Sequence, residues 1–319
     1  MKFVIVIFVL ILLVSCKKEN DSYCVANTEI EYFLTDTIQF IDTVTVYDLI
    51  PIYDTIPIYI EREKRTPKIH NFFDVSFYMA HALGRIDGYD YTNSKEAFEQ
   101  NYLAGYRIFE VDVELTTDGV PVCMHDISSF NSMTGFAGET TILYEDFLSR
   151  KIYEKYTLVS ADFIIEMLIK YDDIYFDLDL VYDAPISLDY IVNNPLLNEL
   201  STSERVKLLK RLIIELYHIE ELEAIRDIFE FKNIALNSYF ITKDRNAQID
   251  LFIENDLDIL VEHYNNLDST IVKFYNDNGI NVVAWTVDDT DMADSLSKWG
   301  VKNIYTNILG FYGNEYTIQ

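Results

Sequence analysis

The amino-acid sequence predicts an α/β fold, a (β/α)8 TIM barrel with a β-hairpin excursion after the second strand. Patterns typical of strands and of helices alternate along residues 71–319, and this alternation predicts a parallel sheet covered by helices. The segment has the roughly 250 residues that a closed barrel of this kind needs. Acidic residues and histidines follow several strand patterns, at the ends where such barrels carry their chemistry.

Nine segments have the composition and alternation of strands, which is one more than the barrel needs. The surplus comes from a hairpin, because Asp118 and Gly119 form a tight-turn signal between the second and third segments. About five linking residues cannot make a parallel crossover, so these two strands are antiparallel and one of them stands above the barrel rim. The nine segments are Val75–Ala80, Ile108–Glu114, Val120–Met124, Ile174–Asp179, Leu212–Tyr217, Asn233–Tyr239, Asp258–Val261, Asn281–Thr286 and Asn303–Thr306.

Helical patterns lie between most of these strands. The first helix is predicted to begin near Asn93, because Asn93 and Glu96 have the spacing of a capping box, and to end at Gly105. The other predicted helices are Ala161–Lys170, Glu204–Arg211, Glu220–Phe229, Ile249–Asn255, Ser269–Asn278 and Met292–Lys298.

The N-terminus predicts export and a lipid anchor. Lys2 is followed by an unbroken apolar run over 3–14, which is shorter than the about 20 residues that span a bilayer. The letters LVSC at 13–16 resemble the lipobox of bacterial lipoproteins. That resemblance implies that residues 1–15 are a signal peptide, that Cys16 is lipidated, and that the exported protein is anchored to a membrane of the bacterial cell envelope. The alternative is an ordinary secretory signal with an incidental cysteine.

Residues 16–70 differ in composition from the rest of the chain and are predicted to form an extended tether. They contain no glycine beyond Cys16, and the pattern at 47–53 is echoed at 53–59. Pro51 and Pro57 keep such a segment extended and out of the middle of a sheet. The alternative for its second half is an edge strand packed on the barrel. The domain itself is then residues 71–319.

Composition limits the partners of the chain. With 25 Lys and Arg against 53 Asp and Glu, the net charge is −28, which excludes nucleic acid as a partner. The same acidity repels an anionic substrate, so such a substrate needs local positive charge, for which a bound cation is the economical source. Cys16 is used by the lipid, Cys24 lies in the tether and Cys123 in the hairpin, so no disulfide framework is expected.

The hairpin gathers carboxylates beside a histidine. Alternation puts Glu110, Asp112 and Glu114 on one face of the second strand, and the turn then puts Asp112 opposite Met124 or His125. All of the candidate metal ligands are oxygen donors, so the predicted cofactor is a divalent cation, Ca²⁺ or Mg²⁺. Carboxylates on such a cation beside a histidine are a common arrangement for cutting a phosphodiester.

Six sequence blocks occur in a fixed order through the predicted barrel. They are residues 79–84 (MAHALG), 91–98 (YTNSKEAF), 105–112 (GYRIFEVD), 115–126 (LTTDGVPVCMHD), 284–288 (AWTVD) and 300–306 (GVKNIYT). Together they resemble the glycerophosphodiester phosphodiesterase family, within the barrels related to phosphatidylinositol-specific phospholipase C. The resemblance implies that His81 and His125 are the catalytic histidines and that Glu110 and Asp112 bind the metal.

The resemblance implies two further site residues. Asp179 falls where the family has another acidic metal ligand, and it is preferred to Asp177 because it lies nearer the C-terminal end of its strand. Trp285, at the end of a later strand, is expected to form a wall of the substrate site.

Three positions depart from the family pattern. Ala82 stands where an arginine usually follows the first histidine, Val181 replaces a lysine, and Asn307 replaces an aspartate. The first two are cations that would contact phosphate through charge-assisted hydrogen bonds. Arg85, on the same loop as Ala82, is therefore expected to bind the substrate phosphate in its place.

The resemblance implies a metal-dependent phosphodiesterase at the cell envelope, which hydrolyses a glycerophosphodiester to an alcohol and glycerol 3-phosphate. The losses at Ala82 and Val181 favour an alternative, a catalytically impaired barrel that binds a phosphorylated ligand or a surface partner. A third possibility is a lyase on a lipid headgroup, related to phospholipase C. The sequence leaves open which alcohol is attached, which histidine is the acid, which membrane leaflet is used and the oligomeric state.

Overall fold

The structure is a computed structural model, and it describes residues 65–136 and 140–310. The predicted signal peptide, Cys16 and most of the predicted tether lie outside the described residues. Within those ranges, no helix is both long enough and apolar enough to cross a membrane.

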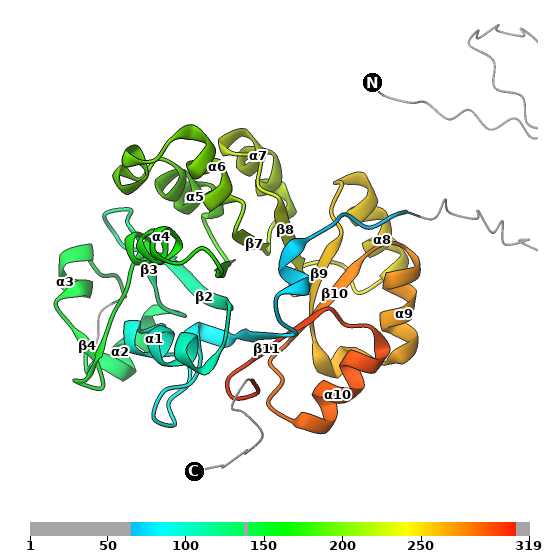
Figure 1. The fold of residues 1–319 in the computed structure, drawn as a ribbon, viewed down its shortest axis with the longest axis horizontal. Coiled ribbons are helices and arrows are strands. Elements are labelled where there is room, and N and C mark those ends of the chain that lie inside the picture. The colour runs from blue at the N-terminus through cyan, green and yellow to red at the C-terminus, as the bar shows by residue number, and fades with distance from the viewer. Residues whose placement is uncertain (1–64, 137–139, 311–319) are drawn as a thin grey trace, which may run out of the picture. The chain divides into compact units, whose positions relative to one another are not determined.

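Eight parallel strands close into a barrel, as predicted (Figure 1). Each strand pairs with the next in the order given below, and β1 pairs with both β2 and β11, so that the ring has no open edge. The strands are β1 (Tyr78–Ala80), β2 (Ile108–Leu115), β6 (Tyr175–Leu180), β7 (Leu212–Leu216), β8 (Asn233–Asn237), β9 (Ile259–His263), β10 (Asn281–Trp285) and β11 (Asn303–Thr306).

The predicted hairpin is confirmed. Strand β3 (Pro121–Cys123) pairs antiparallel with the end of β2 and takes no part in the ring. Val113 lies opposite Cys123, so that Asp112 is level with Met124, as expected from the turn. Cys123, at the end of β3, is a buried, free cysteine.

All seven predicted helices are present, and the structure adds others. Those predicted are α1 (Lys95–Ala104), α4 (Ala161–Lys170), α6 (Thr202–Leu209), α7 (Leu222–Ile228), α8 (Arg245–Glu254), α9 (Ser269–Asp277) and α10 (Thr290–Trp299). The additions are α2 (Ile127–Thr134), α3 (Tyr144–Leu148), α5 (Ala184–Val192), the small hairpin of β4 (Lys151–Ile152) and β5 (Tyr156–Thr157), and short 3-10 turns.

The start of α1 corrects the sequence prediction. Ser94, not Asn93, is the N-cap, and its side chain accepts a hydrogen bond from the backbone N–H of Ala97. Asn93 lies outside the helix because its side chain is bound to Asp112 in the barrel. At the other end, Gly105 has a φ of 111° and caps the helix as predicted.

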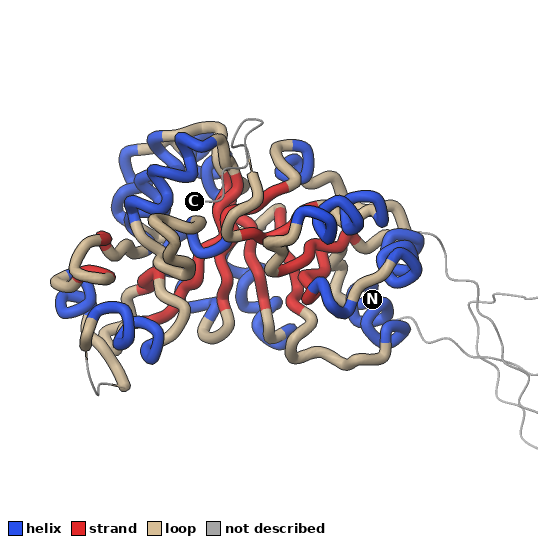
Figure 2. Tube along the Cα trace, turned by 90° about the horizontal axis from the view of Figure 1, so that it is seen from below, coloured by secondary structure: helices blue, strands red, loops and turns tan. Residues whose placement is uncertain are grey.

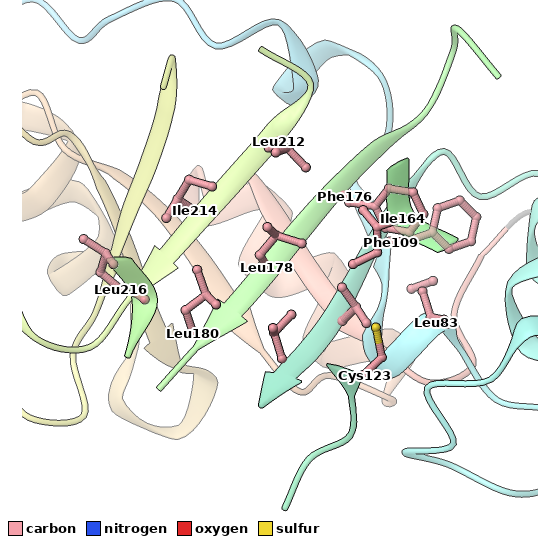
Figure 3. Close-up of a cluster of buried hydrophobic side chains, with 14 of the residues drawn as sticks. Leu83, Phe109, Cys123, Ile164, Phe176, Leu178, Leu180, Leu212, Ile214 and Leu216 are labelled. Carbon is pink, nitrogen blue, oxygen red and sulfur yellow. The ribbon is translucent and has the colours of Figure 1, made fainter. Parts of the chain in front are cut away.

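The core has two layers, and the strand alternation decides which side chain enters which. Outward-facing residues such as Phe176, Leu178 and Leu180 of β6 pack under the helices (Figure 3). The alternate positions of β6, which include Asp177 and Asp179, face the barrel interior. Figure 2 shows the strands at the centre with the helices outside them. The same alternation that builds the apolar layer therefore aims the carboxylates inward.

The segment before β1 packs on the N-terminal end of the barrel. The Arg65 and Lys68 side chains both bind the Asp256 carboxylate, and the backbone N–H of Lys68 donates to Asp258. The buried ring of His70 then lies between Asn233 and Asp258. Residues 65–70, predicted as the end of the tether, are thus held by the barrel.

Candidate active site

A cavity of about 540 Å³ opens at the C-terminal ends of the barrel strands. Side chains from the ends of most strands and from the β3 hairpin line it. They are His81, Tyr91, Glu110, Asp112, His125, Asp179, Val181, Tyr182, Glu215, Tyr217, Asn237, Tyr239, Phe240, Trp285, Thr286 and Tyr305. The sequence predicts seven residues with catalytic, metal-binding or substrate-binding roles: His81, Arg85, Glu110, Asp112, His125, Asp179 and Trp285. All of them except Arg85 line this cavity.

Three carboxylates converge in the cavity. Glu110, Asp112 and Asp179 each offer an oxygen, and these atoms lie within 4.8 Å of one another. The register of the sheet explains the meeting, because Asp112 of β2 lies directly beside Asp179 of β6. Asp177 lies two residues earlier on β6, further from the mouth of the barrel. It accepts a hydrogen bond from Tyr305 at 2.6 Å instead. Asp179, as predicted from its position along the strand, is therefore the member of the cluster.

The three carboxylates fit a hard divalent cation. Among the described residues, Glu110 Oε1 and Asp179 Oδ1 are buried oxygens without a hydrogen-bond partner. Burial, followed by the charges of Asp112 and Asp179, raises the pKa of Glu110 well above its ordinary value. Burial, followed by Glu215 and Asp112, raises the pKa of Asp179 in the same way. Unpaired acidic oxygens that repel one another are what a Ca²⁺ or Mg²⁺ ion would stabilise.

Amide groups hold two of these carboxylates in place. The Asn93 side chain donates to Asp112 Oδ2 at 2.7 Å and accepts from the Asp112 backbone N–H at 3.2 Å. The backbone N–H of Ala82 donates to Glu110 Oε2 at 2.6 Å. Ala82 itself is fully buried, so this position supplies a backbone donor to the cluster and no cation.

A hydrogen-bond chain fixes the tautomer of His81. The Asn307 amide donates to Asp288 Oδ2 at 2.8 Å, and the Asn307 backbone N–H donates to Asp288 Oδ1 at 2.8 Å. Because a carboxylate only accepts, the amide oxygen of Asn307 faces His81, where it accepts from Nδ1–H at 2.9 Å. The His81 Nε2 atom is left toward the cavity, 3.9 Å from Glu110 Oε2.

His125 is held by a carboxylate. Its Nδ1 atom lies 2.6 Å from Asp126 Oδ2, and Asp126 is fixed as the N-cap of α2 by the N–H and hydroxyl of Ser129. Burial lowers the pKa of His125, but the charge of Asp112 and the hydrogen bond of Asp126 outweigh it and raise the pKa. His125 thus has Nδ1 bound to a side-chain oxygen, as His81 does, and it lines the same cavity.

The Tyr91 ring connects the two histidines. It lies edge-on to His81, with ring centroids 4.7 Å apart, and edge-on to His125 at 5.7 Å. Both Tyr91 and Asn93 lie in the block 91–98 that resembles the family. The sequence pattern predicts a helix cap at Asn93 and no site role for either residue, so the structure adds both to the site.

Arg85 does not join the site. Its guanidinium donates two hydrogen bonds to Asp90, at 2.6 Å and 2.7 Å, and it is absent from the cavity lining. Among the described residues that line the cavity there is no lysine or arginine, and Val181 is part of this lining. A phosphate bound in this cavity would meet no lysine or arginine, so a bound metal cation would have to supply the positive charge that faces it.

A second acidic layer lies deeper in the barrel. Glu215 of β7 accepts from Asn237 at 2.6 Å and from the Tyr305 hydroxyl at 2.6 Å, and the same hydroxyl reaches Asp177. The Tyr217 hydroxyl donates upward to Asp179 at 3.1 Å. Sequence reasoning missed Glu215, although a carboxylate inside the apolar strand 212–216 (LIIEL) was a usable signal.

The site combines a closed (β/α)8 barrel with clustered carboxylates that could hold a metal ion and two oriented histidines at its mouth. Residues 85–310 match the glycerophosphoryl diester phosphodiesterase family. The match covers most of the chain, and the protein belongs to this family of hydrolases. No curated protein sequence matches the chain.

Several solved structures share the fold. A structure from Silicibacter pomeroyi DSS-3 has a TM-score of 0.60 and 18% identity, over 74% of this chain and 91% of the other. An Oleispira antarctica phosphodiesterase, solved with its product sn-glycerol-3-phosphate, has a TM-score of 0.57 and 18% identity, over 74% and 94%. A glycerophosphodiester phosphodiesterase from Parabacteroides distasonis has a TM-score of 0.56 and 20% identity, over 72% and 92%.

Proposed function

We propose that this protein is a divalent-cation-dependent phosphodiesterase that hydrolyses glycerophosphodiesters to an alcohol and glycerol 3-phosphate. The observation that carries the proposal is the convergence of Glu110, Asp112 and Asp179 beside two histidines with one ring nitrogen each left for the cavity. Membership of the family supports the reaction, and the product bound in the Oleispira antarctica relative supports glycerol 3-phosphate as one half of the substrate.

The three carboxylates would hold a Ca²⁺ or Mg²⁺ ion, which supplies positive charge for the phosphate and lowers the cost of charge development in the transition state. His81, whose Nδ1–H is committed to Asn307, presents the Nε2 lone pair and accepts the proton of the attacking oxygen. His125, whose pKa is raised, donates a proton from Nε2 to the departing alcohol oxygen as the P–O bond breaks.

The attacking oxygen is either water or a hydroxyl of the substrate's own glycerol. Water gives glycerol 3-phosphate directly, whereas the glycerol hydroxyl first gives a cyclic phosphate, as in a lyase related to phospholipase C. Both routes use the same proton acceptor and donor. Detection of a cyclic product by ³¹P NMR during turnover separates them.

One specific observation favours a binding protein as the second candidate. The described lining of the cavity lacks the two family cations, with Ala82 and Val181 in their places. Such a barrel would bind metal and a phosphorylated ligand without turnover. This candidate and the enzyme make opposite predictions for the same assay.

The assay uses the detergent-solubilised full chain, a panel of glycerophosphodiesters, and Ca²⁺ or Mg²⁺ with and without EDTA. Turnover that EDTA abolishes is expected, together with its loss in Glu110→Gln and its retention in Asp291→Asn, a matched change at an exposed carboxylate on α10. Metal binding without turnover of any diester would select the binding protein. Turnover that survives EDTA and Glu110→Gln would contradict the carboxylate site.

We also propose that the enzyme is lipid-anchored at the bacterial cell envelope, through Cys16. The support is the sequence LVSC at 13–16 after a short apolar run. Cys16→Ala is expected to move the protein from the detergent phase to the aqueous phase in detergent phase separation. Cys24→Ala, a cysteine change in the same segment, is the matched control and should leave partitioning unchanged. Unchanged partitioning of Cys16→Ala would overturn the anchor.

A further inference from the structure

The three clustered carboxylates are each hydrogen-bonded through one oxygen. The bonds are those of Glu110 Oε2 with the Ala82 backbone N–H at 2.6 Å, of Asp112 Oδ2 with the Asn93 amide at 2.7 Å, and of Asp179 Oδ2 with the Tyr217 hydroxyl at 3.1 Å. The donors come from three separate places in the chain: the turn after β1, the loop before α1 and the residue after β7. Each carboxylate is therefore held on one side by a different part of the barrel.

The second oxygen of each carboxylate is left for a ligand. Among the described residues, Glu110 Oε1 and Asp179 Oδ1 are buried and have no hydrogen-bond partner. The cluster brings together one oxygen from each of the three side chains, all within 4.8 Å of one another. Three carboxylates therefore offer a cation three oxygens rather than six.

The polar side chains beside the cluster already use their oxygens. The amide oxygens of Asn93 and Asn237 each accept a backbone N–H, at 3.2 Å and 2.9 Å. Glu215, which lies beside Asp179 in the sheet, accepts through both carboxylate oxygens, from Asn237 and from Tyr305, at 2.6 Å each. A cation held here would take three oxygens from the clustered carboxylates, and water or a substrate phosphate would supply the others.

The two candidate cations use carboxylates differently. Ca²⁺ takes roughly six to eight oxygens in a flexible arrangement and often engages both oxygens of one carboxylate. Mg²⁺ is smaller, takes about six oxygens in a strict arrangement and keeps several waters. A hydrogen-bond donor on the second oxygen prevents a carboxylate from binding the cation through both oxygens, and it fixes the orientation of the side chain. Both effects favour Mg²⁺.

We propose that Tyr217 and Asn93 are positioning residues that select Mg²⁺ over Ca²⁺, because they leave Asp179 and Asp112 with one metal-facing oxygen each. The inference rests on the proposed function, since it concerns the cation of that site, and it adds the side chains that choose between the two cations. Neither residue is itself a metal ligand. Each acts through the carboxylate that it holds, as outer groups commonly do around metal sites.

The test measures metal affinity in the detergent-solubilised full chain after treatment with EDTA and dialysis. Isothermal titration with MgCl₂ and with CaCl₂ gives a Kd for each cation, and the parent is expected to bind Mg²⁺ more tightly. Tyr217→Phe keeps the ring and frees Asp179 Oδ2. Its Mg²⁺ affinity is expected to fall about tenfold. Its Ca²⁺ affinity should fall less, so that the ratio of the two Kd values moves toward Ca²⁺ by about threefold or more.

A second variant repeats the test on Asp112. Asn93 has a φ of 44°, which glycine adopts without strain, so Asn93→Gly removes the amide and keeps the backbone. Its Kd ratio is expected to move in the same direction. Tyr239→Phe is the matched control, because it removes the hydroxyl of a 62% exposed side chain in the same cavity, and both Kd values should match the parent. Circular dichroism of the metal-free proteins checks that each variant is folded.

The outcomes separate this inference from the proposed function. Binding of neither cation by the parent contradicts the proposed metal site itself. Tighter binding of Ca²⁺ by the parent, or an equal loss of affinity for both cations in the two variants, overturns the selection while leaving the metal-dependent enzyme in place. A Kd ratio that moves toward Ca²⁺ in Tyr217→Phe and Asn93→Gly, and not in Tyr239→Phe, supports it.

Discussion

The two ends of the barrel hold histidines in opposite ways. At the N-terminal end, His70 is buried and uses both ring nitrogens, each 3.0 Å from an oxygen, of Asn233 and of Asp258. At the C-terminal end, His81 and His125 each commit only Nδ1 to an oxygen and leave Nε2 to the cavity. A fully bonded imidazole can only stabilise, whereas a half-bonded one can accept or donate a proton.

This contrast follows the division of labour in (β/α)8 barrels, where the N-terminal end of the strands serves stability and the C-terminal end carries chemistry. The number of ring nitrogens that are hydrogen-bonded distinguishes a stabilising histidine from one that can transfer a proton. The predictions below test the contrast, beginning with the largest expected effect.

Replacement of either cavity histidine is expected to abolish most turnover. Alanine at His81 or His125 should lower kcat by roughly two to four orders of magnitude, because each transfers a proton in the same transition state. The double variant should lose little more than the worse single variant. Steady-state kinetics gives the losses, and calorimetry should show that both variants still bind metal. Substantial turnover in the double variant would move the chemistry elsewhere.

Removal of one carboxylate is expected to weaken metal binding well over tenfold. Glu110→Ala leaves two of the three clustered carboxylates, which is too few hard oxygen ligands for tight binding. Isothermal titration with Ca²⁺ and Mg²⁺ measures the affinity, and Asp291→Asn is the control. Parent-like affinity in Glu110→Ala would place the metal outside this cluster.

Metal affinity and metal-free stability are expected to respond to pH in opposite directions. The raised pKa values of Glu110 and Asp179 mean that protons compete with metal, so metal affinity falls as the pH is lowered through these raised pKa values. The folded pKa of each group lies above its unfolded value, so the stability that these groups contribute is present at low pH and lost as pH rises. The free energy of unfolding of the metal-free protein should therefore rise over the same acidification.

Titration calorimetry and urea unfolding at each pH provide the two curves. Because acidification also relieves general repulsion in a chain of net charge −28, the double variant Glu110→Gln, Asp179→Asn is the reference. Its stability should change less with pH than that of the parent. Equal slopes in the two proteins would show that the cluster contributes nothing to the effect.

His70→Ala is expected to destabilise the fold and spare the chemistry. The change leaves the Asn233 and Asp258 oxygens without the imidazole, at a cost of about 1–3 kcal/mol in the free energy of unfolding. At a temperature where the variant is folded, kcat and KM should match the parent. A fall in kcat comparable to that of His81→Ala would break the contrast between the two ends of the barrel.

Arg85→Ala is expected to have the smallest effect. Since the Arg85 guanidinium is bound to Asp90 and lies outside the cavity lining, KM should change by no more than about twofold, whereas loss of a phosphate contact would cost more. Inhibition by inorganic phosphate gives a second readout. A tenfold weaker inhibition in the variant would restore the phosphate role that the sequence suggested for Arg85.

Local patterns determined much of the fold. The period-two alternation of β2 and β6 fixed which residues face inward, and the short turn at Asp118–Gly119 forced the antiparallel hairpin. These properties depend on neighbours within a few residues, so they could be read without coordinates. Helix α2 was not predicted, because three serines among its eight residues give a weak helical signal. In the structure the Asp126 side chain caps its N-terminus and stabilises it.

By itself, the sequence determined the barrel, the carboxylates on β2 and β6, and the histidines at the strand ends. Only the tertiary structure decided how these side chains are held. Closing the ring brings Asn307 to His81 and Asn93 to Asp112, and it stacks the rings of Tyr182, His218 and Phe240, which come from three separate loops. The Arg85 side chain binds Asp90 and does not line the cavity. The physical reason is that the alternation of a strand depends only on neighbouring residues in the sequence. The hydrogen-bond partner of a side chain depends on which groups the folded structure brings close to it.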